Sequence, residues 1–151
     1  MFGILEADEI DELLKNQIVG RIGCHADGLT YIVPISYAYD GDSVFMHTHE
    51  GRKVNIMRKN PSVCFEVEEM VNMANWKSVI AWGTFQEITD HEERNHALTQ
   101  LSQRIFPLIA SKTVHLSDTW PFESDDFPFA GGIVCKIRVT EKTGRFENEQ
   151  L

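Results

Sequence analysis

The sequence predicts a mainly β protein: a six-stranded antiparallel barrel, closed or split, with short helices packed outside it. Six segments carry the apolar alternation of strands, and Asp-Gly turns at 27–28 and 40–41 favour antiparallel neighbours. The helical segments are too few to supply every crossover of a parallel sheet, which excludes a doubly wound fold. A barrel buries the sheet edges that such strands would otherwise expose.

Three helices are expected from the 3.6-residue spacing of apolar side chains and from their end signals. The first covers 7–16 and has acidic residues in its first turn. The second covers 51–59 and stops at Asn60-Pro61. The third opens at a Thr-x-x-Glu capping box, which Thr89 and Glu92 form.

The strands are bounded by turn residues, and together with the helices they make one domain over residues 1–151. A chain of 151 residues is long enough to bury a core without disulfides. A loop rich in Pro, Asp and aromatic residues runs from about 113 to 129. The expected strands are 18–24, 31–39, 43–47, 63–71, 76–88 and 133–140.

The net charge of −9 excludes several classes of partner. With 14 basic against 23 acidic residues, the chain has no basic patch for a nucleic acid, and attraction to an anionic membrane is disfavoured. No apolar run approaches the ~18 residues that a membrane-spanning helix needs, and Met1-Phe2-Gly3 begins no signal peptide. We therefore expect a cytoplasmic protein.

The three cysteines are far apart and form no Cys-x-x-Cys pair. Scattered cysteines in a reducing compartment usually act as small buried apolar residues. A redox-active thiol is the alternative, although no neighbouring residue would activate it. The positions are Cys24, Cys64 and Cys135.

The segment 44–53 carries the strongest chemical signal, because it is a strand that breaks into a loop and then starts a helix. Arg52 and Lys53 fall in the first helical turn, where a cation opposes the helix dipole. A bound anion reverses that effect, since free N–H groups, the Thr48 hydroxyl and two cations would together hold a phosphate. The alternative is a solvated pair of cations, and spacing alone does not decide between the two.

His47 and His49 lie two residues apart and can point to one face of an extended segment. Two histidines are too few for a zinc site, and the neighbouring sequence supplies no third ligand. A hydrogen-bonding role at a ligand, or simple exposure, is favoured over metal binding.

Pro34 lies inside a strand pattern, where it removes a hydrogen-bond donor and indicates an edge, a bulge or an approaching ligand. Its face of the strand is compact, as a flat ring would require. Ser78 begins a later strand and can hydrogen-bond a ring edge, while Trp82 and Gly83 indicate core packing or a bulge. The motifs of hydrolases and of P-loop or Rossmann proteins are missing, which favours chemistry by a bound cofactor.

Taken together, these segments resemble the pyridoxamine 5′-phosphate oxidase-like FMN-binding split barrels, and within them the nitroimidazole-resistance branch. Oxidases proper have an Arg where Tyr31 stands and end in a Trp-Arg-Leu-type segment, which this chain lacks; the resemblance therefore does not extend to vitamin B6 oxidation. The residues that carry it are Gly20-Arg21-Ile22-Gly23, the run 31–37, the run 44–53, the run 60–65 and Ser78-Val79-x-x-Trp82-Gly83.

The resemblance implies FMN as cofactor and a homodimer that holds each flavin between two subunits. Four consecutive strand residues would line the isoalloxazine and the ribityl chain, and two residues at the end of the next strand would border the flavin. Two cations would hold its phosphate, and one serine would reach the ring. In that order these residues are Val33, Pro34, Ile35 and Ser36; His47 and Thr48; Arg52 and Lys53; and Ser78.

Two functions follow as hypotheses. The first is a flavoenzyme that passes electrons from NAD(P)H through FMN to a small acceptor; the catalytic side chain is unknown, and His47 or His49 is the best candidate for a proton donor. The second is a binding protein without turnover that carries a flavin, or haem with an axial histidine from 47–49. The visible spectrum of the purified protein separates them.

Overall fold

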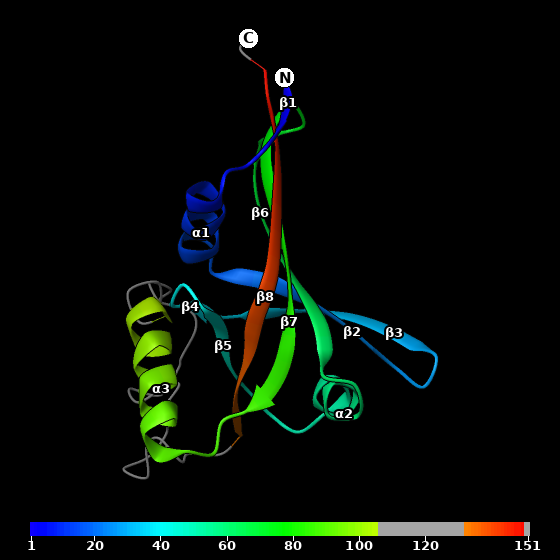
Figure 1. The fold of residues 1–151 in the computed structure, drawn as a ribbon, viewed down its shortest axis with the longest axis vertical. Helices are drawn as coiled ribbons and strands as arrows, with labels where there is room; N and C mark the ends of the chain where they lie inside the picture. The colour runs from blue at the N-terminus through cyan, green and yellow to red at the C-terminus, as the bar shows by residue number, and fades with distance from the viewer. Residues whose placement is uncertain (106–131, 150–151) are drawn as a thin grey trace, which may run out of the picture.

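A computed structural model describes residues 1–105 and 132–149 of the chain (Figure 1). The loop expected at 113–129 lies outside these residues. None of the described helices is long and apolar enough to cross a membrane. The elements are β1 (Phe2–Ile4), α1 (Ala7–Asn16), β2 (Val19–Ala26), β3 (Leu29–Ser36), β4 (Ala38–Tyr39), β5 (Ser43–Thr48), α2 (Arg52–Lys59), β6 (Ser62–Asn72), β7 (Asn75–Glu87), α3 (His91–Ile105) and β8 (Ile133–Asn148).

Every strand pairing is antiparallel, and the strands form one curled sheet in the order β3-β2-β6-β7-β8-β5-β4, with β1 added on β8. The predicted antiparallel split barrel with helices outside is therefore confirmed. The count of six strands is wrong, because the described sheet has eight and does not close. The expected strand at 31–39 divides at Tyr37, whose N–H turns to the Ile18 carbonyl and whose hydroxyl donates to the Leu14 carbonyl at 2.6 Å.

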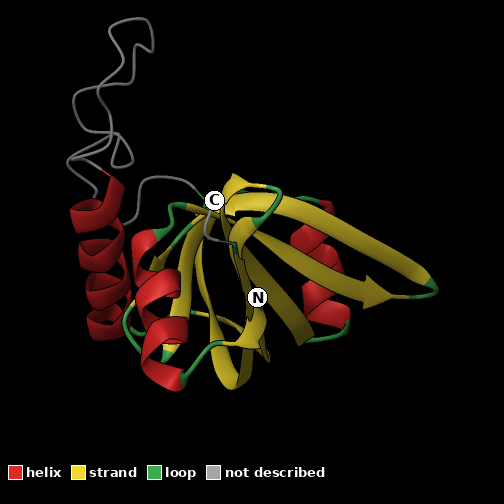
Figure 2. Cartoon of the chain, turned by 90° about the horizontal axis from the view of Figure 1, so that it is seen from above, coloured by secondary structure: helices red, strands yellow, loops and turns green. Residues whose placement is uncertain are grey.

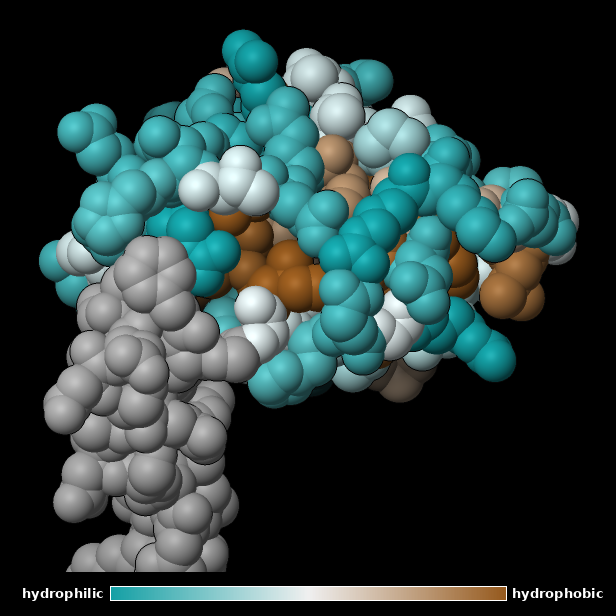
Figure 3. Space-filling view, turned by 90° about the horizontal axis from the view of Figure 1, so that it is seen from below, coloured by the Kyte–Doolittle hydropathy of each residue, from teal (hydrophilic) through white to brown (hydrophobic). Residues whose placement is uncertain are grey.

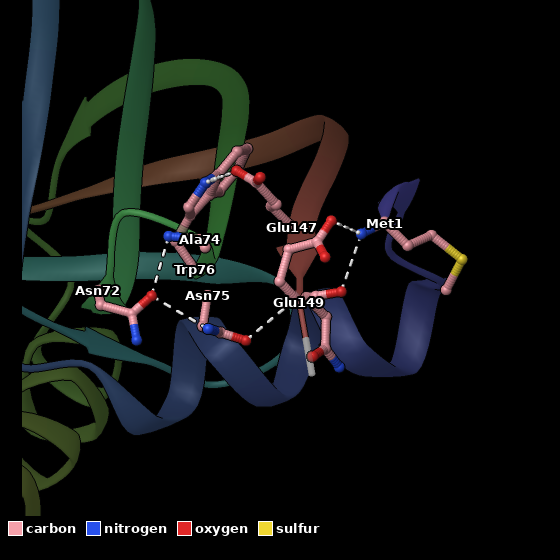
Figure 4. A network of polar contacts seen from close by, with 8 residues as sticks. Met1, Asn72, Ala74, Asn75, Trp76, Glu147 and Glu149 are labelled. Atoms are coloured by element: carbon pink, nitrogen blue, oxygen red, sulfur yellow. Dashed lines mark hydrogen bonds and ion pairs between the residues drawn. The ribbon is translucent and has the colours of Figure 1, made fainter. Parts of the chain in front are cut away.

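The second reason for the wrong count lies at the chain ends, which pair with each other. β1 pairs with the last residues of β8, so that Phe2 lies opposite Glu147. The N-terminal ammonium donates to the Asn148 carbonyl and to the Glu149 carboxylate, and the Trp76 indole donates to Glu147 (Figure 4). These contacts extend β8 to Asn148, eight residues beyond the expected end at Thr140.

The helices α1 and α2 pack against the same hydrophobic core from different sides. Both put apolar side chains into one core with β2, β5, β6, β7 and β8. Helix α3 lies outside and covers Phe45 and Val134 in a second cluster. Figure 2 shows α1 and α3 on one side of the strands and α2 on the other. The buried helical residues include Ile10, Leu13 and Leu14 of α1, Val54, Ile56 and Met57 of α2, and Ala97, Leu98 and Leu101 of α3.

The start of α3 differs from the expected capping box. The helix begins at His91, and the side chain of Asp90 accepts a hydrogen bond of 3.0 Å from the Glu93 N–H. Asp90 is therefore the N-cap, one residue later than the predicted Thr89. Asp is as good an N-cap as Thr, and the sequence offers both in succession.

Two local predictions about backbone geometry are confirmed. Asp27 and Gly28 have φ of 52° and 77° and join β2 to β3 in a two-residue turn of the I′ kind. The pairing of β7 with β8 shifts register between Trp82 and Gly83, which is the expected bulge. A Cβ at Gly83 would lie 2.2 Å from the Arg138 carbonyl oxygen, so only glycine fits there.

Candidate functional site

The candidate site is built where β5 ends and α2 begins. β5 pairs with β8 up to Thr48, which lies opposite Ile133. The chain then passes through three residues to α2, which Val54 and Met57 anchor in the core. The start of α2 is thus held at a fixed place beside the end of β5. Seen from the end of the molecule that carries α2, the described surface is mostly hydrophilic around a hollow with hydrophobic side chains in its floor (Figure 3).

The start of α2 has the features of an anion site. An α-helix leaves its first N–H groups without intrahelical acceptors, and here the N-cap is Gly51, which has no side chain to accept from them. The first turn contains no acidic residue. Arg52 is exposed and Lys53 half-buried, and neither has a hydrogen bond or ion pair within the described part of the chain.

The other two cations of the helix behave differently. Arg58 and Lys59 lie in the last turn, where a cation stabilises the helix dipole, and both are ion-paired. Arg58 contacts Glu50 and Glu87, and Lys59 contacts Asp27 at 2.8 Å. The cations of the first turn oppose the helix dipole and are unpaired in the described part of the chain, whereas those of the last turn are ion-paired. This arrangement is expected of a helix whose start binds an anion.

His47, near the end of β5, and His49, in the loop before α2, lie close together. The rings of His47 and His49 pack edge to face with their centroids 5.8 Å apart. Gly132, at φ 97°, brings the start of β8 against them, since a Cβ there would lie 3.0 Å from His47 Nε2 and 2.7 Å from the Thr48 carbonyl oxygen. No group of three His, Cys, Asp or Glu side chains in residues 1–105 and 132–149 could hold a metal, so a histidine metal site has no support there.

Residues 33–36 lie in β3, which is an edge strand of the described sheet and pairs there with β2. The edge position explains how Pro34 is tolerated. Val33 and Ile35 pack against the core, while Pro34 and Ser36 are exposed on the opposite face of the strand. The chain runs from Ser36 through Tyr37 into β4, which pairs with β5, so one short connection joins these residues to the strand that carries His47 and Thr48.

Ser78 is not brought to the same place within one chain. It lies in β7, and its hydroxyl is 3.4 Å from a carboxylate oxygen of Glu66. Burial, followed by the charge of Glu68, raises the pKa of Glu66. Glu87, which contacts Arg58 of α2, lies nine residues further along β7, so at ~3.3 Å per residue roughly 30 Å of strand separate it from Ser78.

A feature that sequence reasoning missed is an apolar pocket of about 620 Å³ on the outer face of the sheet. Ile32 is 67% and Trp82 is 38% exposed there. Alternation along each strand predicts which residues share a face, but the pocket also requires the register between strands that are far apart in sequence. Gly23 and Cys64 lie between the Ile32 and Trp82 side chains in the lining of the pocket.

The cysteines support the structural interpretation. Cys24 and Cys135 are buried and Cys64 is half-buried, and all three are free thiols. Burial raises the pKa of Cys24 and raises that of Cys135 to about 12, which keeps both protonated at neutral pH. Neither is an activated nucleophile.

The comparisons with known proteins place the chain in a family. The model of the family described as pyridoxamine 5′-phosphate oxidase matches residues 6–145. The chain belongs to this family. An uncharacterized protein of Rhizobium meliloti (strain 1021) is 31% identical over 105 residues, which are 67% of this chain and 70% of that protein.

Several solved structures share the fold of this chain. A FAD-binding protein from Mesorhizobium loti is 28% identical, with a TM-score of 0.75 over 99% of this chain and 98% of its own. A FAD-binding protein from Mycobacterium smegmatis has a TM-score of 0.69 at 24% identity, covering 97% and 100%. A candidate 5-nitroimidazole antibiotic resistance protein from Bacteroides thetaiotaomicron has a TM-score of 0.71 at 20% identity, covering 97% and 87%. The predicted membership of the family is confirmed, and the nitroimidazole-resistance protein shares the fold.

Proposed function

We propose that the protein binds FMN and acts as an oxidoreductase that passes electrons from NAD(P)H to a small acceptor. The observation that carries this proposal is the uncapped start of α2 with its two unpaired cations, Arg52 and Lys53. The family and its FAD-binding structures supply the class of cofactor. FMN and FAD both carry a phosphate on the ribityl chain, so the same anion site serves either flavin.

The residues around α2 fit the rest of a flavin. Arg52 and Lys53 would hold the phosphate, with N–H groups of the helix start as further donors. Val33 to Ser36 would lie along the ring and ribityl chain, and His47 and Thr48 would border the ring. When bound, the flavin supplies the hydride and electron chemistry. The protein binds and orients it, excludes water, and offers His47 or His49 as a proton donor.

The protein is proposed to be a homodimer that meets through the outer face of the sheet. This face carries exposed apolar side chains on β2, β3 and β7, among them Val19 (50% exposed), Ile32 and Ile80 (37%). The five strands from β3 to β8 span roughly 19 Å at ~4.8 Å between neighbours, and eight residues along a strand span roughly 26 Å. The projected area of about 500 Å² is of the order of the ~800 Å² that each partner of a stable dimer covers. A second subunit would also supply Ser78, which one chain keeps far from its own α2.

Flavin titrations into apo-protein test the anion site. A charged hydrogen bond to phosphate contributes ~1.5–3 kcal/mol, so Arg52→Ala and Lys53→Ala should each weaken FMN binding by roughly ten- to a hundredfold. Riboflavin, which lacks the phosphate, should bind both variants as it binds the parent. Tighter binding of FAD than of FMN by the parent would replace FMN by FAD in the proposal.

Lys59→Ala is the matched control. It removes a cation of the same helix that is already paired with Asp27, and FMN affinity should stay within twofold of the parent. If Arg52→Ala and Lys53→Ala also stay within twofold, the phosphate lies elsewhere and the site is wrong.

The second candidate, a binding protein for haem or flavin without turnover, rests on the adjacent rings of His47 and His49, either of which can ligate iron. A haem spectrum in the purified protein would favour it over the flavoenzyme. A flavin spectrum that NADH and NADPH both fail to bleach would favour a flavin carrier.

A further inference from the structure

A carboxylate lies next to the anion site, and one arginine holds it. Glu50 immediately precedes the N-cap Gly51. Arg58 binds it with two parallel contacts, Nη1 to Oε2 and Nη2 to Oε1, each of 2.7 Å. The same guanidinium contacts Glu87 Oε1, at the end of β7, at 2.5 Å. Glu50, in the loop before α2, and Glu87, at the end of β7, thus share one arginine.

The geometry of the helix explains how Arg58 reaches so far. Side chains on an α-helix lean toward its N-terminus, so a long side chain in the last turn extends back along the helix. Its contact with Glu87 fixes the guanidinium against β7, and the paired contact engages both oxygens of the Glu50 carboxylate, while the start of α2 has no side-chain cap.

Without Arg58, the Glu50 carboxylate would be attracted to the start of α2. A carboxylate just before a helix is attracted by the unpaired N–H groups and by the positive end of the dipole. Arg52 and Lys53 add two positive charges there. Glu50 is an anion at neutral pH, and the contact with Arg58 lowers its pKa further. It would compete with a phosphate for the same donors.

We propose that Arg58 is a positioning residue of the anion site: it holds Glu50 away from the start of α2, so that a phosphate meets two cations and no competing carboxylate. The inference rests on the proposed function, because it concerns the same site. Arg58, in the last turn of α2, would thus affect phosphate binding at the first turn.

The test measures FMN and riboflavin affinities of apo-protein for the parent, Arg58→Ala, Glu50→Gln and the double variant. Two unit charges a few Å apart in water interact by about RT ln 5, so Arg58→Ala should weaken FMN binding about fivefold and leave riboflavin binding unchanged. In the double variant the released side chain is neutral, and FMN affinity should return to within twofold of the parent. Glu50→Gln alone should leave the FMN affinity within twofold of the parent. In the parent, Arg58 already keeps the Glu50 carboxylate from competing with the phosphate, so its removal changes little.

The rescue separates positioning from support of the fold. If Arg58 only stabilises the loop, Glu50→Gln cannot restore the affinity, and that result overturns the proposal. An unchanged FMN affinity of Arg58→Ala overturns it as well. Should Arg58→Ala fail to fold, Arg58→Gln, which keeps most of the side chain's length without its charge, replaces it in the same cycle.

Lys59→Ala is again the control, since it removes a neighbouring cation that does not touch Glu50. The two proposals fail in different ways. If Arg52→Ala and Lys53→Ala leave FMN affinity unchanged, the anion site itself is wrong. If they weaken it while Arg58→Ala does not, only the positioning role is lost.

Discussion

At the scale of single residues, three buried proton donors define how the core responds to pH. The Tyr39 hydroxyl donates to Asp11 at 2.9 Å and accepts from Lys142 at 3.2 Å, which ties β4 to α1 and β8. Burial raises the pKa of Tyr39 to about 12 and also raises the pKa of Tyr37. Burial likewise raises the pKa of Cys135. Each group is neutral in the fold and would be charged only at a high free energy.

These pKa values predict loss of stability at alkaline pH. The unfolded chain releases the Cys135 proton near pH 9 and the tyrosine protons near pH 10, whereas the folded protein keeps them to about pH 12 for Cys135 and Tyr39. The unfolded state then binds fewer protons, so the free energy of unfolding falls with pH by up to ~1.4 kcal/mol per unit for each group. Urea unfolding with a reductant present should show the full stability at pH 8 and a decline above pH 9.

Tyr39→Phe is the check on this assignment. It removes one of the groups, so its stability should decline less steeply than that of the parent between pH 10 and pH 12, whatever its stability at pH 8. Equal slopes would show that Tyr39 ionises as easily in the fold as in the unfolded chain.

At the scale of elements, the helices were predictable and the ends of the strands were not. Helix α1 agrees with the expected 7–16, and α2 differs only in that Gly51 is its N-cap rather than its first residue. Local spacing and end signals are enough for such helices. β1 and the last part of β8 have no such signal, because residues such as Glu141 and Lys142 are polar, and only pairing between the two chain ends makes strands of them.

The candidate site divides in the same way. The start of α2 could be located from the sequence, because it depends on a short continuous segment. The pairing of Arg58 with both Glu50 and Glu87 could not, since Glu87 is 29 residues away along the chain. The outer pocket around Ile32 and Trp82 also needs the register of strands that are far apart in sequence.

The cap of α3 gives a direct test at this scale. Asp90→Ala removes the side-chain acceptor of the Glu93 N–H and should lower the free energy of unfolding by ~1 kcal/mol. Thr89→Ala, at an exposed position that makes no cap, should change it by less than about 0.5 kcal/mol. Urea unfolding of both variants decides the matter, and a larger loss for Thr89→Ala would reinstate the predicted capping box.

At the scale of the whole molecule, the outer face of the sheet bears on whether the protein acts as a monomer or as a dimer. A sheet with one face on the core normally leaves the other face polar. Here that face is interrupted by Val19, Ile32, Ile80 and Trp82, all more than a third exposed. Among the polar residues of that face, Arg21 forms ion pairs with Glu66 and Glu68 within the chain. A second copy would cover the apolar part and complete the flavin site with Ser78.

Ile32→Asp tests both consequences together. Ile32 is 67% exposed in the single chain, so the change should leave the stability of the monomer within about 0.5 kcal/mol. In a dimer through this face it would bury an unpaired charge in each subunit, which costs at least ~3 kcal/mol and should weaken association by more than about a hundredfold. Sedimentation velocity would show monomers where the parent is dimeric, and FMN affinity should fall although Arg52 and Lys53 are intact.

Met73→Asp, at an 89% exposed position in the turn between β6 and β7, is the control and should remain dimeric. A dimer of undiminished strength in Ile32→Asp would place the subunit contact on another surface, and monomers that still bind FMN fully would show that each chain completes its own site.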